Sequence, residues 1–308
     1  MTLFRRLAVT STGAAFLLVT IGGLVRATKS GLGCGTNWPD CPGAVNRALI
    51  IEFSHRAAAG IVVMLLAALA VTALRNHRDT RAVVVPAVAA FGLVLFQAAL
   101  GAIVVVLELE ASSVVLHLGT AMILLALLIH LSVVSLALEG RLRVSSDLPT
   151  RKLAVGAAGS VFLLLLVGSY VTGTGAGNVF PDWPLMNSSV IPDLSVASQA
   201  SHFIHRALAL AVGVMLIVVA VRIIRSKDRL ERQASLARVA LGLFAAEVLV
   251  GAANVWSDMN AIWVTTHLAL GAGIWASLVG IAVISHPALQ ELPGAQRVRQ
   301  RQPALETS

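Results

Sequence analysis

Eight long apolar segments dominate the sequence and limit what the chain can fold into. Each is about 20 residues or longer, enough for a helix with ~1.5 Å rise per residue to cross a hydrocarbon layer of ~30 Å. The segments lie at about 7–25, 50–74, 82–107, 112–138, 152–172, 199–221, 236–256 and 261–284. Charged residues make up 12% of the chain and hydrophobic residues 57%, which excludes a disordered protein. A strict period-two alternation, which would indicate a membrane β-barrel, is missing. The sequence therefore predicts an all-α polytopic membrane protein.

The basic residues predict the orientation of these helices. Of the 23 Lys and Arg residues, 18 fall on the side of both termini, the tail residues Arg297, Arg299 and Arg301 among them. Because basic loops stay in the cytoplasm, both termini are predicted to be cytoplasmic. The net charge of +8 is then a topology signal that involves the lipid bilayer and requires no nucleic-acid partner. The N-terminus is not transit-like, which favours a bacterial plasma membrane.

An internal repeat divides the eight segments into two sets of four. At an offset of 150 residues, 53–56 aligns with 203–206, 101–102 with 251–252, and 117–118 with 267–268; at 145, Trp38-Pro39 aligns with Trp183-Pro184. The repeat argues that the first segment is retained and is not a cleaved signal peptide. Because four is an even number, the two copies keep the same membrane orientation, related by a pseudo-two-fold axis along the membrane normal. We expect pseudo-symmetric four-helix bundles at 1–140 and 151–285, a cytoplasmic linker at 141–150 and a cytoplasmic tail at 286–308.

Four histidines fall within apolar segments at matched depth. They are His55, His117, His205 and His267, each about five residues below the outer end of its predicted helix. Two histidines from facing helices of one bundle can hold a haem iron from opposite faces, so the pattern predicts one such site per bundle. The alternative is a set of buried histidines bonded to backbone carbonyls. Zinc or copper fits less well, because these metals favour carboxylate or thiolate ligands at a compact site.

Three further residues near these histidines carry charge. Arg56 and Arg206 directly follow His55 and His205, and each is a candidate to bind a haem propionate or to anchor its helix at the headgroups. Glu52 lies one turn nearer the outside than His55, where it can take a proton, stabilise positive charge or cap the helix. Its counterpart in the second bundle is His202. This asymmetry predicts one reactive site and one supporting site.

Other polar residues have weaker signals. Cys34 and Cys41, the only cysteines, share one outer loop, where a pair can form a structural disulfide or take part in redox exchange. Gln97 and Glu247 correspond across the repeat; Glu247 is either a proton relay or, as we prefer, a carboxyl bonded to a neighbouring helix. We expect a structural role for His130 and no site role for the remaining two histidines, His77 and His286.

Several of these motifs together resemble the bacterial haem A synthase family. The resemblance covers about residues 8–285 and is carried by the segments Gly22–Cys34, Trp38–Cys41, Glu52–Arg56, Val171–Gly175 and Phe203–Arg206, together with His117 and His267. One departure is Lys29, where a small or neutral residue is expected. The cysteine pair matches the subclass with loop cysteines.

The resemblance implies an oxidoreductase that converts the C8 methyl group of haem O to a formyl group by successive hydroxylations, giving haem A for terminal oxidases. It implies that substrate haem O lies near His55 and His117, that a haem b cofactor is held by His205 and His267, and that Glu52 is the essential carboxylate. Candidate partners are haem O synthase, cytochrome oxidase assembly factors and a second copy of the chain.

Two other classes of protein compete with this interpretation. A dihaem b-type electron carrier would explain four histidines but would give Glu52 no role. A transporter would be consistent with the repeat, and its histidines would then bind protons or substrate. A purified transporter would be colourless, whereas the synthase and the carrier would both contain haem pigment. Product formation from haem O would then distinguish the synthase from the carrier.

Overall fold

The computed structural model describes residues 2–227 and 229–300. The last eight residues of the predicted tail, 301–308, lie outside these ranges, and Arg301 is one of them. Within the described ranges, eight helices are long and apolar enough to cross a membrane. They are α1 (Leu3–Ala27), α2 (Arg47–Asn76), α3 (Arg81–Val106), α4 (Ala111–Leu138), α5 (Leu148–Gly173), α6 (Ala197–Arg225), α7 (Glu231–Trp256) and α8 (Ala261–Ile284). The prediction of an all-α polytopic membrane protein is confirmed.

Most helices extend a few residues beyond their predicted ends. Helix α1 begins at Leu3 and α5 at Leu148, four residues before each predicted start. In both cases a polar side chain caps the helix: Thr2 Oγ1 accepts the amide of Arg5 at 3.4 Å, and Asp147 Oδ1 accepts the amide of Thr150 at 2.9 Å. Hydropathy marks only the apolar stretch, whereas capping allows polar residues to join the first turn.

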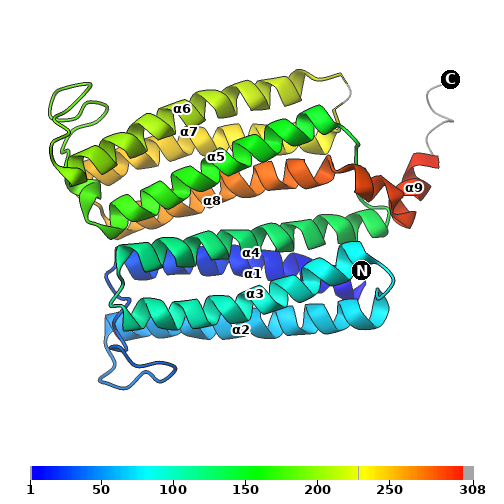
Figure 1. Ribbon diagram of the computed structural model, residues 1–308, viewed down its shortest axis with the longest axis horizontal. Helices are drawn as coiled ribbons and strands as arrows, with labels where there is room; N and C mark the ends of the chain where they lie inside the picture. Colours follow the sequence, from blue (N-terminus) through cyan, green and yellow to red (C-terminus); the bar gives the residue numbers. More distant parts are fainter. Residues whose placement is uncertain (1, 228, 301–308) are drawn as a thin grey trace.

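The helices form two groups that lie side by side, α1–α4 and α5–α8 (Figure 1). Helices α1 and α4 of the first group contact α8, and α4 also contacts α5. Close packing is possible where Gly23 of α1 meets α8, because a Cβ at this position would lie 2.7 Å from Leu268 Cδ2. At the outer end, Arg26 Nη2 donates to the Gly173 carbonyl at 2.9 Å. These contacts join the two groups along one seam.

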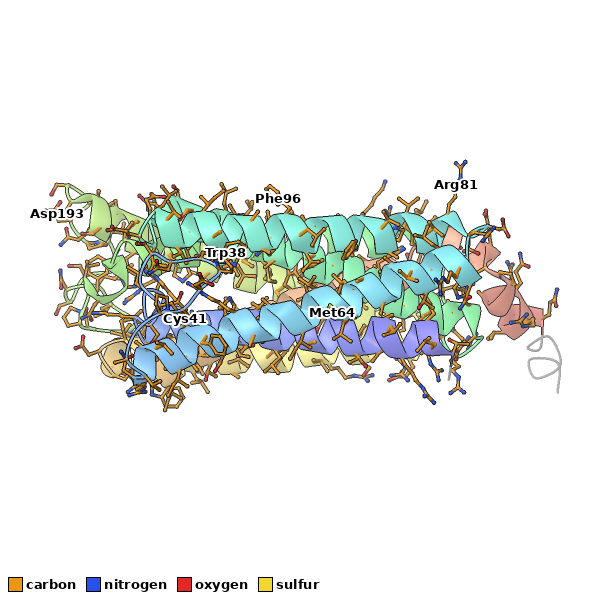
Figure 2. The ribbon with its side chains drawn as sticks, turned by 90° about the horizontal axis from the view of Figure 1, so that it is seen from below. Trp38, Cys41, Met64, Arg81, Phe96 and Asp193 are labelled. Atoms are coloured by element: carbon orange, nitrogen blue, oxygen red, sulfur yellow. A yellow bond between two sulfur atoms is a disulfide. The ribbon has the colours of Figure 1, made fainter. Side chains whose placement is uncertain are left out.

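The loops 28–46 and 174–196, which are predicted to be the outer loops, lie at one end of the molecule, and the start of α1 and helix α9 lie at the other (Figure 1). Figure 2 shows the loop residues Trp38, Cys41 and Asp193 at the end opposite Arg81. In α2 and α6 the buried apolar side chains begin at Val62 and Val212, and in α4 they begin at Met122. The tightly packed core therefore lies deeper than the level of the four histidines.

The chain after α8 folds back against the first group. It forms the 3₁₀ helix η2 (Pro287–Glu291) and the short helix α9 (Pro293–Gln300). Gly294 approaches the end of α4 so closely that a Cβ would lie 2.2 Å from the carbonyl oxygens of Ala137 and Leu138. The segment 287–300, which the sequence suggested only as a tail, is thus packed against the bundle ends.

Candidate functional site

The repeat places the four histidines in matched positions on α2, α4, α6 and α8. His55 and His205 each lie eight residues after the first residue of their helix, and His117 and His267 each lie six residues after theirs. At ~1.5 Å per residue these positions are about 12 Å and about 9 Å along the helix axis. All four side chains are partly buried. The predicted matched depth is therefore present within each corresponding pair.

Every one of these imidazoles packs against a glycine of the preceding helix. A Cβ at Gly22 would lie 3.2 Å from His55 Cε1, and the corresponding distances are 3.3 Å for Gly101 and His117, 3.0 Å for Gly168 and His205, and 3.3 Å for Gly251 and His267. Only glycine leaves room for a ring at this distance without a shift of the neighbouring atoms. The four histidine–glycine contacts fix where each ring lies. The sequence interpretation missed this role, although Gly101 and Gly251 recur at the offset of 150.

The two histidines of each bundle lie on its second and fourth helices, His55 and His117 on α2 and α4, and His205 and His267 on α6 and α8. The Nδ1 atoms of His55, His117 and His205 are buried without a hydrogen-bond partner among the described residues, and that of His267 has Glu247 Oε1 at 3.2 Å but no hydrogen bond of good geometry. No Nε2 atom of these rings is among the buried, unpartnered atoms, so Nε2 is the nitrogen that stays accessible. An accessible imidazole nitrogen in a fixed ring is a ligand suited to iron, zinc or copper. Each bundle thus offers two candidate iron ligands, and that they hold one planar metal complex between them stays a prediction.

Glu52 is a buried carboxylate above the His55 ring. It lies in the second turn of α2, three residues before His55, and the residue is 3% exposed. Its Oε2 accepts the backbone amide of Cys34 at 2.8 Å, and its Oε1 forms an ion pair with Arg56 Nη2 at 2.5 Å. Both oxygens are therefore engaged, and the carboxylate is held in one position with its negative charge compensated by Arg56.

Arg56 connects α2 to the outer loop above the site. Its Nη1 donates to the carbonyl oxygens of Asn37 at 3.0 Å, Pro39 at 3.3 Å and Asp40 at 3.1 Å. The same loop is closed by a disulfide between Cys34 and Cys41. The predicted pairing is present, and both predicted roles of the pair, structural support and redox exchange, stay predictions. Binding of a propionate by Arg56 stays a prediction, because the guanidinium lies on loop carbonyls in this structure.

The second bundle has a matching contact with different chemistry. Arg206 Nη1 donates to the carbonyl oxygens of Asp182 at 3.2 Å and Leu185 at 2.9 Å, and its Nε donates to His202 Nε2 at 3.0 Å. The Phe180 ring lies 5.6 Å from the guanidinium carbon. Arg206 Nη2 is buried with no partner among the described residues. It is a free donor beside the His205 site, suited to a carboxylate.

The polar pair inside the membrane also differs between the bundles. Glu247 Oε1 lies 3.2 Å from His267 Nδ1, and Glu247 Oε2 is buried without a partner among the described residues. In the first bundle Gln97 Nε2 instead donates to the backbone carbonyl of His117 at 2.7 Å. Glu247 thus contacts the neighbouring helix α8, and both of its predicted roles, proton relay and a carboxyl bonded to that helix, stay predictions.

The three other histidines of the described residues that the sequence set aside lie away from these sites. His130 Nε2 lies 3.3 Å from the Ala82 carbonyl oxygen, and His77 packs against Phe4 with ring centroids 4.9 Å apart. His286 Nδ1 accepts the amide of Ala288 at the start of η2. Each of these contacts joins neighbouring helices or caps a helix, as is usual for a histidine with a structural role.

Fold and site together define a class: a membrane protein of two four-helix bundles, each with one histidine on its second helix and one on its fourth. Comparison with known proteins then identifies the family. The model of the COX15-CtaA family, cytochrome oxidase assembly protein, matches residues 5–48 and 45–279. The chain belongs to this family.

Curated relatives agree with this assignment. The chain is 34% identical over 218 residues to the Heme A synthase of Halalkalibacterium halodurans, covering 68% of this chain and 72% of the relative. It is 30% identical over 280 residues to that of Geobacillus kaustophilus, with 83% and 84% covered. It is 27% identical over 301 residues to that of Symbiobacterium thermophilum, with 93% and 97% covered. The similarity extends over nearly the whole chain.

Proposed function

We propose that this protein is a haem A synthase, an oxidoreductase that converts the C8 methyl group of haem O to a formyl group by successive hydroxylations. Relatives named Heme A synthase match it over most of their length. The observation that carries the proposal is the pairing of two alike histidine sites with a buried carboxylate, Glu52, one turn before His55, where the second bundle has His202 instead. A dihaem electron carrier has no need of that asymmetry.

In this proposal the two bundles have different roles. The first bundle, 1–140, holds substrate haem O between His55 and His117. The second, 151–285, holds haem b between His205 and His267, and the buried, unpartnered Nη2 of Arg206 is the donor for one of its propionates. The fit rests on accessible Nε2 atoms, on glycines that accommodate the rings, and on a packed core that begins deeper in the bundle. A bound haem supplies one-electron chemistry at its iron.

Glu52 acts at the edge of the substrate site. Cys34 and Arg56 hold its carboxylate in place. A fixed negative charge stabilises positive charge that develops on the reacting carbon, and it needs no reorganisation during the reaction. We place the loops 28–46 and 174–196 outside the cytoplasm and both termini inside, in a bacterial plasma membrane, since most basic residues are at the end that carries the termini.

Product analysis tests the proposal. The full chain is expressed in a membrane with a haem O source, and the extracted pigments are analysed by mass spectrometry. The wild type is expected to yield haem A, which has one oxygen more and two hydrogens fewer than haem O. Glu52→Gln, which keeps an acceptor for the Cys34 amide, is expected to yield haem O unchanged. The control Glu291→Gln removes an exposed carboxylate at the opposite end. Unchanged haem O from the wild type, or a colourless protein, would overturn the proposal.

A further inference from the structure

A basic cleft lies at the end of the molecule opposite the histidines. Its walls come from the linker 141–147, the start of α5, the end of α6 and helix α9, and its volume is about 1020 Å³. Four cationic side chains line it: Arg143, Lys152, Arg222 and Arg299. All four are exposed. We refer to these four residues as the basic cleft.

Most of the charge of the basic cleft is not compensated. None of its four cations forms an ion pair or a side-chain hydrogen bond within residues 2–227 and 229–300, whereas Arg5 and Arg141 nearby pair with Glu139. The lining includes one carboxylate, Asp147, whose Oδ1 already accepts the Thr150 amide. Four unpaired cations around one concave surface repel one another, and a bound anion relieves that repulsion.

The cleft does not follow simply from the excess of basic residues on this side. Two of its walls, the linker and α9, lie outside the repeat. Arg222 also corresponds to an uncharged residue, Thr72, at the offset of 150. Arg299 joins Arg143 and Arg222 because α9 packs against the end of α4, where Gly294 permits a close approach. Residues from four separate segments thus converge on one bundle.

Next to the cations, the lining has hydroxyl groups and an apolar floor. Ser146 and Ser226 contribute hydroxyls, and Leu153 and Ile223 belong to the membrane-spanning helices α5 and α6. Guanidinium groups bind phosphate oxygens in pairs, and hydroxyls donate to the same oxygens. Helix ends of a membrane protein lie at the level of the phospholipid headgroups, and basic pockets between them bind anionic headgroups.

We propose that the basic cleft is a binding site for a phosphate group, with the headgroup of an anionic phospholipid or a free phosphate as its source. The proposal is independent of the haem chemistry, because the cleft lies at the other end of the helices. A phosphate held there would connect α5 and α6 to α9.

Lipid retention tests the site. The full chain in nanodiscs with phosphatidylglycerol and phosphatidylcholine is released and analysed by native mass spectrometry. The wild type is expected to retain phosphatidylglycerol in preference to phosphatidylcholine. The variant Arg143→Gln/Arg222→Gln/Arg299→Gln is expected to bind it at least about tenfold more weakly, given the strength of hydrogen bonds to charged groups. The matched control, Arg75→Gln/Arg78→Gln/Arg81→Gln, removes three exposed arginines at the same end of the first bundle and is expected to retain it.

A second arm separates the two sources. Inorganic phosphate is titrated by calorimetry into the wild type and both variants in phosphatidylcholine nanodiscs. Binding that is lost only in the cleft variant assigns a free phosphate, and lipid retention without phosphate binding assigns a headgroup. Equal weakening in the cleft variant and its control would overturn the proposal, as would a wild type that binds neither probe. Circular dichroism of both variants confirms that they are folded.

Discussion

The first bundle carries a carboxylate, Glu52, one turn before His55, whereas the second bundle carries an imidazole, His202, one turn before His205. Beneath them the bundles are alike: each histidine packs on a glycine, and each arginine of the pair Arg56 and Arg206 donates to carbonyls of its outer loop. The shared parts are those that position a planar ligand. The parts that differ are the side chains that supply charge next to the planar ligand. The shared residues therefore hold the ligand, and the residues that differ determine which chemistry takes place beside it.

The two outer loops are also closed by different means. A disulfide between Cys34 and Cys41 closes the first loop. In the second loop Asp182 accepts the backbone amides of Asn187 at 2.8 Å and Ser188 at 2.7 Å. The first loop is bonded to the site through Glu52, so its covalent closure also restrains the carboxylate. Each difference between the bundles suggests a measurement that affects one of them more than the other.

The largest expected effect comes from removing the difference at Glu52. Glu52→His makes the first bundle like the second and is expected to lower the rate of haem A formation by about 10²- to 10⁴-fold, the usual contribution of a positioned acid–base group. His202→Gln keeps an acceptor for Arg206 and is expected to reduce the rate far less. Both rates are measured as haem A extracted per mole of protein over time. Equal losses in the two variants would show that the bundles do not differ in this way.

A second prediction separates the two haem sites through their glycines. Valine at Gly22 or Gly168 would push against the ring of His55 or His205, and overpacking of this kind costs about 1–3 kcal/mol. Gly22→Val is expected to lower the content of haem O, and Gly168→Val the content of haem b, each measured by pigment extraction from purified protein. Gly13→Val is the control, because a Cβ there has no neighbour within 4 Å. If both variants lost the same pigment, the assignment of one haem to each bundle would be wrong.

The sequence predicted the helices and the matched positions of the histidines on them well, because both depend on periodic or repeated features; the role of the histidines as ligands stays a prediction. An apolar run long enough to span a bilayer has few alternatives to a helix, and His117 and His267 recur at one offset. Helix ends were less well predicted, since capping by Thr2 and Asp147 depends on single polar side chains.

The glycine partners and the loop contacts were harder to predict for a different reason. The contact between Gly22 and His55 joins two helices across a long loop, and a single sequence does not show which residues of neighbouring helices meet. Arg56 was expected to bind a propionate or lie at the headgroups. The structure adds a third possibility, loop carbonyls, because an irregular backbone has acceptors that no helix satisfies.

The third prediction concerns the disulfide of the first loop. A disulfide typically contributes about 2–4 kcal/mol to the free energy of unfolding. Reduction is therefore expected to raise deuterium uptake in residues 30–46 but not in residues 176–194, as measured by hydrogen exchange with mass spectrometry at neutral pH. Cys34→Ser/Cys41→Ser is expected to behave like the reduced protein without any reductant. Unchanged uptake in 30–46 would show that Arg56 and Glu52 alone hold the loop.

The smallest effect is expected in the second loop, where a carboxylate takes the place of the disulfide. The amide of Ser188, with that of Asn187, lowers the pKa of Asp182 from its usual 3.8, because both bonds favour the charged form. A lowered pKa contributes stability above pH 3.8 that is lost as the pH falls through the lower, folded value. Pepsin, which is active in acid, is therefore expected to cleave residues 182–192 faster at about pH 3 than at about pH 5, relative to an unstructured peptide substrate. Asp182→Asn is expected to be cleaved at similar relative rates at both pH values, since it has no carboxylate to protonate. If the wild type were cleaved at the same relative rate at both pH values, the contacts of Arg206 would hold this loop without the Asp182 carboxylate. The two loops would then differ less in stability than the disulfide and the carboxylate that close them suggest.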